Sequence, residues 1–170
     1  VGPAPVVDDT QSEGTLNWNF NSGSEAFNSL AAGETLVLSY TVTVTDDAGS
    51  PLSDSVTITV TITGSNDTPA VTGGSTTGVV TETNATITAS GTFVIEDVDT
   101  TDTVTAAVVG VAASGNTSGL APSAAALKAM LSVQTGEVVT SSSSTGSATW
   151  NFNSGTEAFD YLAAGESLTL

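Results

Sequence analysis

The sequence predicts an all-β protein, built from antiparallel β-sandwich units that repeat in tandem and carry short helical insertions. Three observations support this class: apolar residues alternate with Thr in several short segments, turn-forming residues separate these segments, and one segment of 21 residues occurs twice. Alternation with period two is typical of strands with one buried face. Many short strands separated by turns are typical of sandwiches.

The clearest strands are Tyr40–Thr45 and Val56–Thr63, in which Tyr, Val or Ile alternate strictly with Thr. β-Branched residues on both faces favour the extended conformation. The residues between these segments, Asp46–Pro51, are rich in Asp, Gly, Ser and Pro, which form turns. We therefore expect an antiparallel hairpin with a dry apolar face and a wet face covered by Thr.

The remaining elements follow from the same signals. Further strands are expected over Thr15–Phe20, Thr76–Thr81, Thr86–Glu96, Thr103–Val111, Glu137–Thr140 and Ser147–Phe152. Short helices are expected over Ser24–Gly33, over its copy Thr156–Gly165, and over Pro122–Leu131. Ser or Thr begins each of the first two as an N-cap, and Gly ends it. The third carries its larger apolar residues on a common face.

The repeat sets the domain organisation. Trp18–Leu38 recurs as Trp150–Leu170, 132 positions later, with five differences in 21 residues. Pro69 interrupts the ladder after the hairpin and marks a boundary. Residues 1–64 are thus expected to be the C-terminal half of one unit, and residues 65–170 the N-terminal part of the next.

In this register the second unit lacks its final hairpin, the part that matches Ser39–Gly64. A sandwich without two strands exposes an apolar groove and unpaired edges. Two explanations remain open. The chain is cut from a longer array, or a hairpin from another copy fills the gap by strand addition.

Charge excludes several functions. The chain has 18 acidic residues, one basic residue (Lys128) and a net charge of −17. Nucleic acids and anionic membrane surfaces both require basic side chains, so neither is an expected partner. No apolar run is long enough to span a membrane. Inorganic cations remain as the natural counter-charge.

An enzyme is not expected. With neither His nor Cys, the chain cannot build a Ser-His-Asp or Cys-His nucleophile or an ordinary zinc site. Trp18 and Trp150 could stack on sugars, but each lies in an alternating strand pattern with a Phe on the same face. Packing in a core is the simpler interpretation.

The carboxylates gather at strand ends and in turns. Asp97, Asp99 and Asp102 follow an expected strand that ends at Glu96, and alternate side chains of an extended loop can converge on one point. The other candidate cation ligands are Glu96, Asn66, Asp67, Glu82, Asp46 and Asp47. Ca²⁺ takes six to eight oxygen ligands, often from one short loop and from distant residues. The alternative is that these are ordinary solvated turn residues.

Several segments together resemble one family. Thr61–Pro69 is similar to the linker of the VCBS-type, cadherin-like tandem repeats in giant bacterial RTX (biofilm-associated) surface adhesins, and Phe93–Asp102 is similar to their early acidic loop. Leu162–Glu166 and Val42–Gly49 resemble their late segments. The resemblance implies an Ig/cadherin-like fold and Ca²⁺-binding extracellular modules. It also implies that Asn66 and Asp67 bind calcium at the joint between domains.

Two functions follow as hypotheses. The first is a Ca²⁺-stabilised stalk module of a large adhesin on the bacterial cell surface, whose partners are neighbouring repeats of the same chain. The second is a subunit of an extracellular filament or surface layer, whose partners are neighbouring copies that complete its truncated sandwich. Concentration-dependent polymers are expected only from the second.

Overall fold

A computed structural model describes residues 6–8 and 10–170, and over these residues the protein is all-β apart from one short helix, as expected. The strands are β1 (Thr35–Thr45), β2 (Ser53–Thr63), β3 (Ala70–Gly74), β4 (Thr88–Glu96), β5 (Val104–Thr105), β6 (Ser114–Gly115), β7 (Leu131–Val133), β8 (Glu137–Val139), β9 (Thr145–Asn153) and β10 (Leu168–Thr169). The helix is α1 (Ala124–Ala129). The chain forms two compact units. Unit 1 comprises residues up to Phe27 and Leu36–Ile62, and unit 2 comprises Asn28–Thr35 and Thr63–Leu170.

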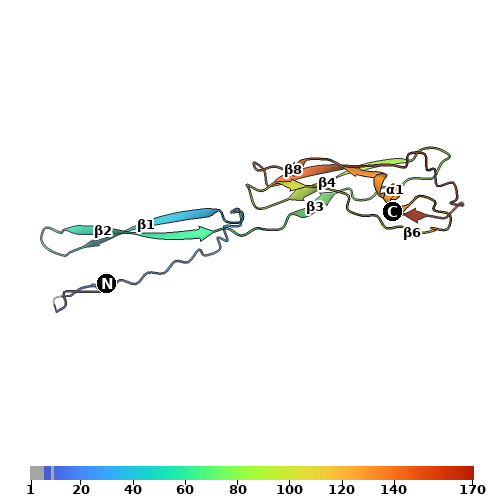
Figure 1. Cartoon of the computed structure of the whole chain (residues 1–170). Coiled ribbons are helices and arrows are strands. Elements are labelled where there is room, and N and C mark those ends of the chain that lie inside the picture. The colour runs from blue at the N-terminus through green and yellow to red at the C-terminus, as the bar shows by residue number, and fades with distance from the viewer. Residues whose placement is uncertain (1–5, 9) are drawn as a thin grey trace. The chain divides into compact units, whose positions relative to one another are not determined.

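Unit 1 is organised around the hairpin of β1 and β2, which Figure 1 shows as a long two-stranded ribbon. The Thr43 and Ser55 hydroxyls lie 2.8 Å apart, and the Asp46 N–H donates to the Leu52 carbonyl at the turn. The predicted hairpin is therefore confirmed. Its apolar face is not dry, however, since Val44 and Val56 are more than half exposed. Among the described residues of unit 1, no second sheet covers that face.

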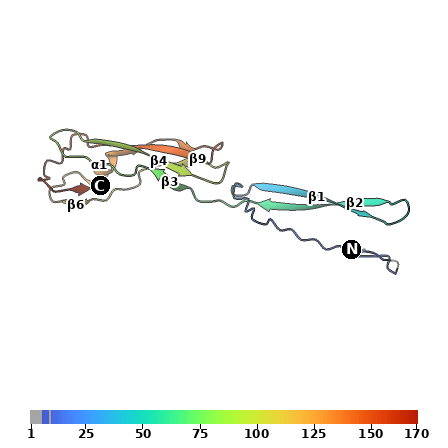
Figure 2. The same ribbon diagram turned by 180° about the vertical axis from the view of Figure 1, so that it is seen from behind.

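Unit 2 contains a four-stranded antiparallel sheet in the order β3-β4-β9-β7. β4 and β9 pair along their full lengths, from Thr88 opposite Asn153 to Glu96 opposite Thr145, and Figure 2 shows them side by side. Two smaller antiparallel pairs, β5 with β8 and β6 with β10, complete the unit. β4 and β9 are therefore the two central strands of the sheet, and each also pairs with one edge strand.

The core of unit 2 consists of two clusters. One contains Ile95 on β4, Val138 and Val139 on β8, and Ala148 on β9. The other gathers Ile87, Leu127 and Phe159, with Phe152, Leu162 and Leu168 packed against it. Trp150 on β9 lies across Gly91 on β4, where a side chain would collide with the indole ring. All of these buried residues belong to unit 2, whereas no residue of the hairpin strands is buried in the described part of unit 1.

Three strand predictions were wrong or too long. Thr15–Phe20 forms no strand, although its copy lies within β9. Only the copy has neighbouring strands to pair with, β4 on one side and β7 on the other. Thr76–Thr81 is also not a strand, since β3 pairs with β4 earlier, over Ala70–Gly74. In Thr103–Val111 only Val104–Thr105 finds a partner, β8. The other predicted strands are present, although β1 begins five residues and β2 three residues earlier than predicted. The ends of β4, β8 and β9 differ from the prediction by one or two residues.

Two of the three predicted helices were wrong. Ser24–Gly33 and Thr156–Gly165 form successive turns instead. Phe27 and Phe159 have φ angles of 57° and 60°, values that an α-helix does not allow. In each copy the Glu two residues earlier accepts the backbone N–H of this Phe at 2.9 Å. A local side-chain hydrogen bond has replaced the helical one.

The third helix is confirmed. α1 covers Ala124–Ala129, and the Ser123 hydroxyl caps it by accepting the Ala126 N–H. Leu127 and Met130 of the predicted apolar face pack in the core, whereas Ala126 is exposed.

Candidate metal site

The acidic loop Asp97–Asp102 begins where β4 ends, and the alternation of the strand continues into it. Ile95, Asp97 and Asp99 are buried, whereas Glu96 and Val98 are exposed. The period-two pattern that buries Ile95 therefore also carries two carboxylates into the interior of unit 2. Burial of ionised groups costs free energy unless hydrogen bonds or a counter-charge compensate for it.

Asp99 is only partly compensated. It is fully buried, and its Oδ2 atom accepts the backbone N–H of Asp67 at 2.7 Å. Its own N–H donates to Asp97 Oδ1 at 3.1 Å. Its Oδ1 atom has no hydrogen-bond partner among the described residues. Buried polar oxygens rarely lack a partner, and either an ordered water molecule or a cation can supply the missing one.

A third segment of the chain reaches the same loop. Glu34 Oε1 accepts the Thr101 hydroxyl at 2.9 Å, and the Thr100 hydroxyl donates to the Ser29 carbonyl at 3.2 Å. The Gly64 N–H in turn donates to the Glu34 carbonyl at 2.8 Å. Segments that begin near residues 29, 64 and 97 thus meet at one place in unit 2.

These carboxylates repel one another. The pKa of Asp102 lies above its ordinary value, mainly through desolvation, and then through the negative charges of Asp99, Asp97 and Glu34. In the absence of a cation these neighbouring charges therefore disfavour the ionised form of Asp102. A bound divalent cation would remove this repulsion.

The residue types suit a hard cation. Carboxylates and backbone carbonyls are the ligands that Ca²⁺ prefers, and the orphaned Oδ1 of Asp99 is available to it. As they are arranged, however, the described residues include no group of three Asp or Glu side chains close enough to hold a metal ion. Binding would therefore require the carboxylates to converge by side-chain rotation.

The structure brings some of the predicted ligands together and separates others. Asp97, Asp99, Asp102 and the backbone of Asp67 meet in the cluster, and Asn66 lies beside it, with its amide donating to the Asp67 carbonyl. Glu96 is the last residue of β4, and its side chain is on the opposite face to Asp97. It is adjacent in sequence but is not directed into the cluster.

The other three predicted ligands lie elsewhere. Glu82 precedes β4 and lines an apolar groove, so it is separated from the acidic loop by a nine-residue strand, roughly 30 Å. Asp46 and Asp47 belong to the hairpin turn of unit 1. There Asp46 Oδ1 accepts the N–H groups of Ala48 and Leu52, which is the role of a turn residue.

Glu34 was not among the predicted ligands. It is 63 positions from Asp97, and its local sequence, Ala-Ala-Gly-Glu, carries no ligand spacing. Only its occurrence at the same place in both copies of the repeat, as Glu34 and Glu166, could have drawn attention to it. Its role in the cluster comes from tertiary packing.

No protein-family model, no curated protein and no solved structure matches this chain. Among the described residues, no helix has both the length and the apolar character needed to cross a membrane.

Proposed function

We propose that this chain is a Ca²⁺-stabilised module of a tandem array, with Ig/cadherin-like sandwich units, that acts as the stalk of a large bacterial surface adhesin outside the cell. The near-identical repeat and the resemblance to VCBS-type adhesin repeats support the array. Arrays of similar modules supply length and spacing rather than chemistry.

One observation carries the calcium part of the proposal. Asp99 buries a carboxylate oxygen that has no hydrogen-bond partner in the part of the chain that the structure describes, within a cluster that also includes Asp97, Asp102 and Glu34. Without a cation, these carboxylates raise the free energy of the folded state, and a bound cation would lower it. Binding to the folded state alone stabilises it by mass action, by about 2.7 kcal/mol when free Ca²⁺ is 100 times Kd.

The position of the cluster along the chain explains why calcium would matter to a stalk. Glu34 comes directly before β1, and Asp67 follows β2 by four residues. A cation bound by both would link the two segments through which unit 2 connects to the hairpin. This would restrict motion at the joint between modules.

Thermal unfolding in millimolar Ca²⁺ and in EDTA tests the proposal. The wild-type midpoint should be higher in Ca²⁺, and small-angle scattering should show a narrower range of particle dimensions. In Asp99→Asn, which preserves shape and removes the charge, the difference between the two midpoints should disappear. Glu96→Gln is the matched control, since it removes a neighbouring charge outside the cluster and should keep the calcium response. Equal wild-type midpoints in Ca²⁺ and EDTA would contradict the proposal.

A further inference from the structure

The turn Asn28–Thr35 belongs to unit 2, although in sequence it leads into the hairpin of unit 1. Gly64, the first residue after β2, is bonded to the end of this turn. Its N–H donates to the Glu34 carbonyl at 2.8 Å, and its carbonyl accepts the Gly33 N–H at 3.2 Å. The outgoing and the returning segments of the hairpin are therefore bonded to each other within unit 2.

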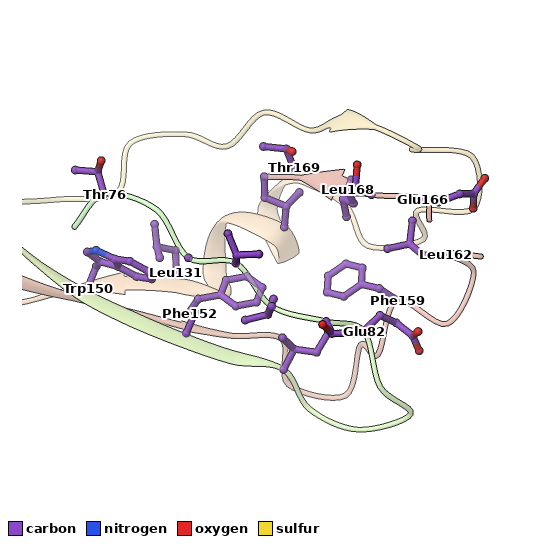
Figure 3. A pocket seen from close by; sticks show the side chains of 18 of the residues that line it. Thr76, Glu82, Leu131, Trp150, Phe152, Phe159, Leu162, Glu166, Leu168 and Thr169 are labelled. Atoms are coloured by element: carbon purple, nitrogen blue, oxygen red, sulfur yellow. The ribbon is translucent and has the colours of Figure 1, made fainter. Parts of the chain in front are cut away.

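The shape of the turn is fixed by its own residues. The Glu34 N–H donates to the Ala31 carbonyl at 3.0 Å, and Glu34 Oε2 accepts the Ala31 N–H at 2.9 Å. In the second copy of the turn, Glu166 and Ala163 make the same two bonds, at 2.9 and 2.8 Å. That copy borders the apolar groove of unit 2, where Figure 3 shows Leu162 and Glu166. The same turn thus forms in two different surroundings.

Burial distinguishes the two copies of the turn. Ala31 is only 5% exposed, whereas Ala163 is an exposed residue. Glu34 is half-buried, whereas Glu166 is exposed. Since the local bonds are the same, the difference comes from what packs against each copy. The first copy is docked on other segments of unit 2 through this face, and the second copy is not.

The acidic loop holds the docked copy on one side. The Thr100 hydroxyl donates to the Ser29 carbonyl at 3.2 Å, and the Thr101 hydroxyl donates to Glu34 Oε1 at 2.9 Å. A single hydrogen bond at the surface contributes little to stability. These two, however, join the beginning and the end of the same preformed turn to neighbouring residues of the loop. Protein atoms alone supply both donors and both acceptors.

Gly64 holds the turn on another side. A Cβ atom at this position would collide with the backbone carbonyl oxygens of Leu30 and Ala31, so only a glycine lets the returning segment pass this close to the turn. Three residues later, the Asp67 N–H donates to Asp99 Oδ2 at 2.7 Å. The returning segment is therefore fixed to the turn at one point and to the acidic loop at another.

We propose that the turn Asn28–Thr35, Gly64 and the loop Asp97–Asp102 form a clasp that closes without calcium and fastens the turn of one repeat to the repeat that follows it. The assignment of the turn to the preceding repeat rests on the proposed array, but the contacts of the clasp do not rest on cation binding. The clasp places Glu34 beside the acidic loop in advance. A cation would then meet backbone segments that are already joined, and only side chains would have to rotate.

Amide hydrogen exchange of the full chain, followed by NMR in EDTA, tests the clasp. Ala31 and Ala163 have identical neighbours in sequence, Leu before and Ala after, so their intrinsic exchange rates are the same. Each donates to the same kind of acceptor, a Glu carboxylate. The Ala31 amide should exchange at least about tenfold more slowly than the Ala163 amide, because a docked turn opens less often. Equal rates of the two amides in the wild type would overturn the proposal.

Gly64→Ala should open the clasp, since its methyl group pushes the turn away from the returning segment. The ratio of the Ala163 rate to the Ala31 rate should then fall toward one. Gly73→Ala is the matched control, because it adds the same methyl group where no other described residue comes within 4 Å, and it should keep the wild-type ratio. The amides that pair β4 with β9 should stay protected in both variants, which shows that the sheet is folded. A wild-type ratio in Gly64→Ala would contradict the clasp.

Thr101→Val tests the acidic loop without disturbing the backbone. It keeps the shape of the side chain and removes the hydroxyl whose hydrogen bond Glu34 accepts. The Ala31 amide should exchange about two- to tenfold faster, the effect of losing one ordinary hydrogen bond. The control Thr103→Val, at an exposed position two residues further on, should have no effect. Equal Ala31 rates in the two valine variants would overturn the role of the acidic loop in the clasp.

The clasp and the cation site can fail separately. Slow exchange of Ala31 in EDTA, together with equal thermal midpoints in EDTA and Ca²⁺, would support the clasp and contradict the cation site. Slow exchange that appears only in Ca²⁺ would overturn the clasp and leave the cation site standing.

Discussion

Trp18–Leu38 and Trp150–Leu170 have 16 of 21 residues in common, and they repeat the same local hydrogen bonds. Asn21 and Asn153 each accept the N–H of the Gly two residues later at 2.8 Å. Their surroundings differ, since Trp18 is 58% exposed and Trp150 only 8%. The same residues thus make the same turns in both copies, but the tryptophan is buried only in the copy that belongs to a sheet.

The largest expected effect tests this difference at the two tryptophans. Trp150→Ala should lower the free energy of unfolding of unit 2 by about 3–5 kcal/mol, because it empties a packed site and removes the hydrogen bond to the Ser75 carbonyl. Trp18→Ala should cost about 0.5 kcal/mol or less, as for most exposed positions. Urea denaturation followed by circular dichroism measures both. Equal losses would mean that unit 1 buries Trp18 in solution.

A smaller effect is expected at the glycine opposite Trp150. A Cβ atom on Gly91 would lie 2.6 Å from the indole nitrogen. Gly91→Ala should therefore destabilise unit 2 by about 1–3 kcal/mol, the usual cost of overpacking. Combined with Trp150→Ala, it should cost much less than alone, because the indole is gone. A double-mutant cycle in urea measures this coupling, and additive losses would contradict the packing described here.

Glu34 and Glu166 allow a third comparison. Both cap a turn, accepting the N–H of Ala31 and of Ala163 respectively. Only Glu34 reaches the acidic loop. Glu34→Gln should weaken Ca²⁺ binding roughly tenfold, or about 1.4 kcal/mol, whereas Glu166→Gln should leave it unchanged. Isothermal titration calorimetry of both variants measures the difference, and similar affinities would remove Glu34 from the site.

The smallest effect concerns pH. The pKa of Asp102 is raised in the folded state. The contribution of this group to folding stability is therefore complete below the unfolded pKa of 3.8 and is lost as the pH rises through the folded pKa. In EDTA at neutral pH, Asp102→Asn should therefore unfold at a slightly higher temperature than the wild type, and the gap should close on acidification. In Ca²⁺ the order should reverse. A wild type that is the more stable in EDTA at neutral pH would contradict the repulsion.

Sequence patterns were reliable where the cause is local. Alternation predicted β1, β2, β4 and β9, since the side-chain period of a strand appears directly in the residue order. The common apolar face predicted α1, whereas the capping signals failed at Ser24–Gly33 and Thr156–Gly165. In both failures a Glu side chain accepts the N–H of a Phe held at positive φ.

In the candidate site, too, the sequence predicted the local arrangement but not the long-range contacts. The sequence by itself determined that Asp97 and Asp99 share a face, because they continue the alternation of β4. Only the tertiary structure decided that Glu34 and the backbone of Asp67 join them, and that Glu96, Glu82, Asp46 and Asp47 do not. It likewise decided which of two nearly identical segments has a core. Burial and long-range hydrogen bonds depend on what packs against a segment, which its own residues do not specify.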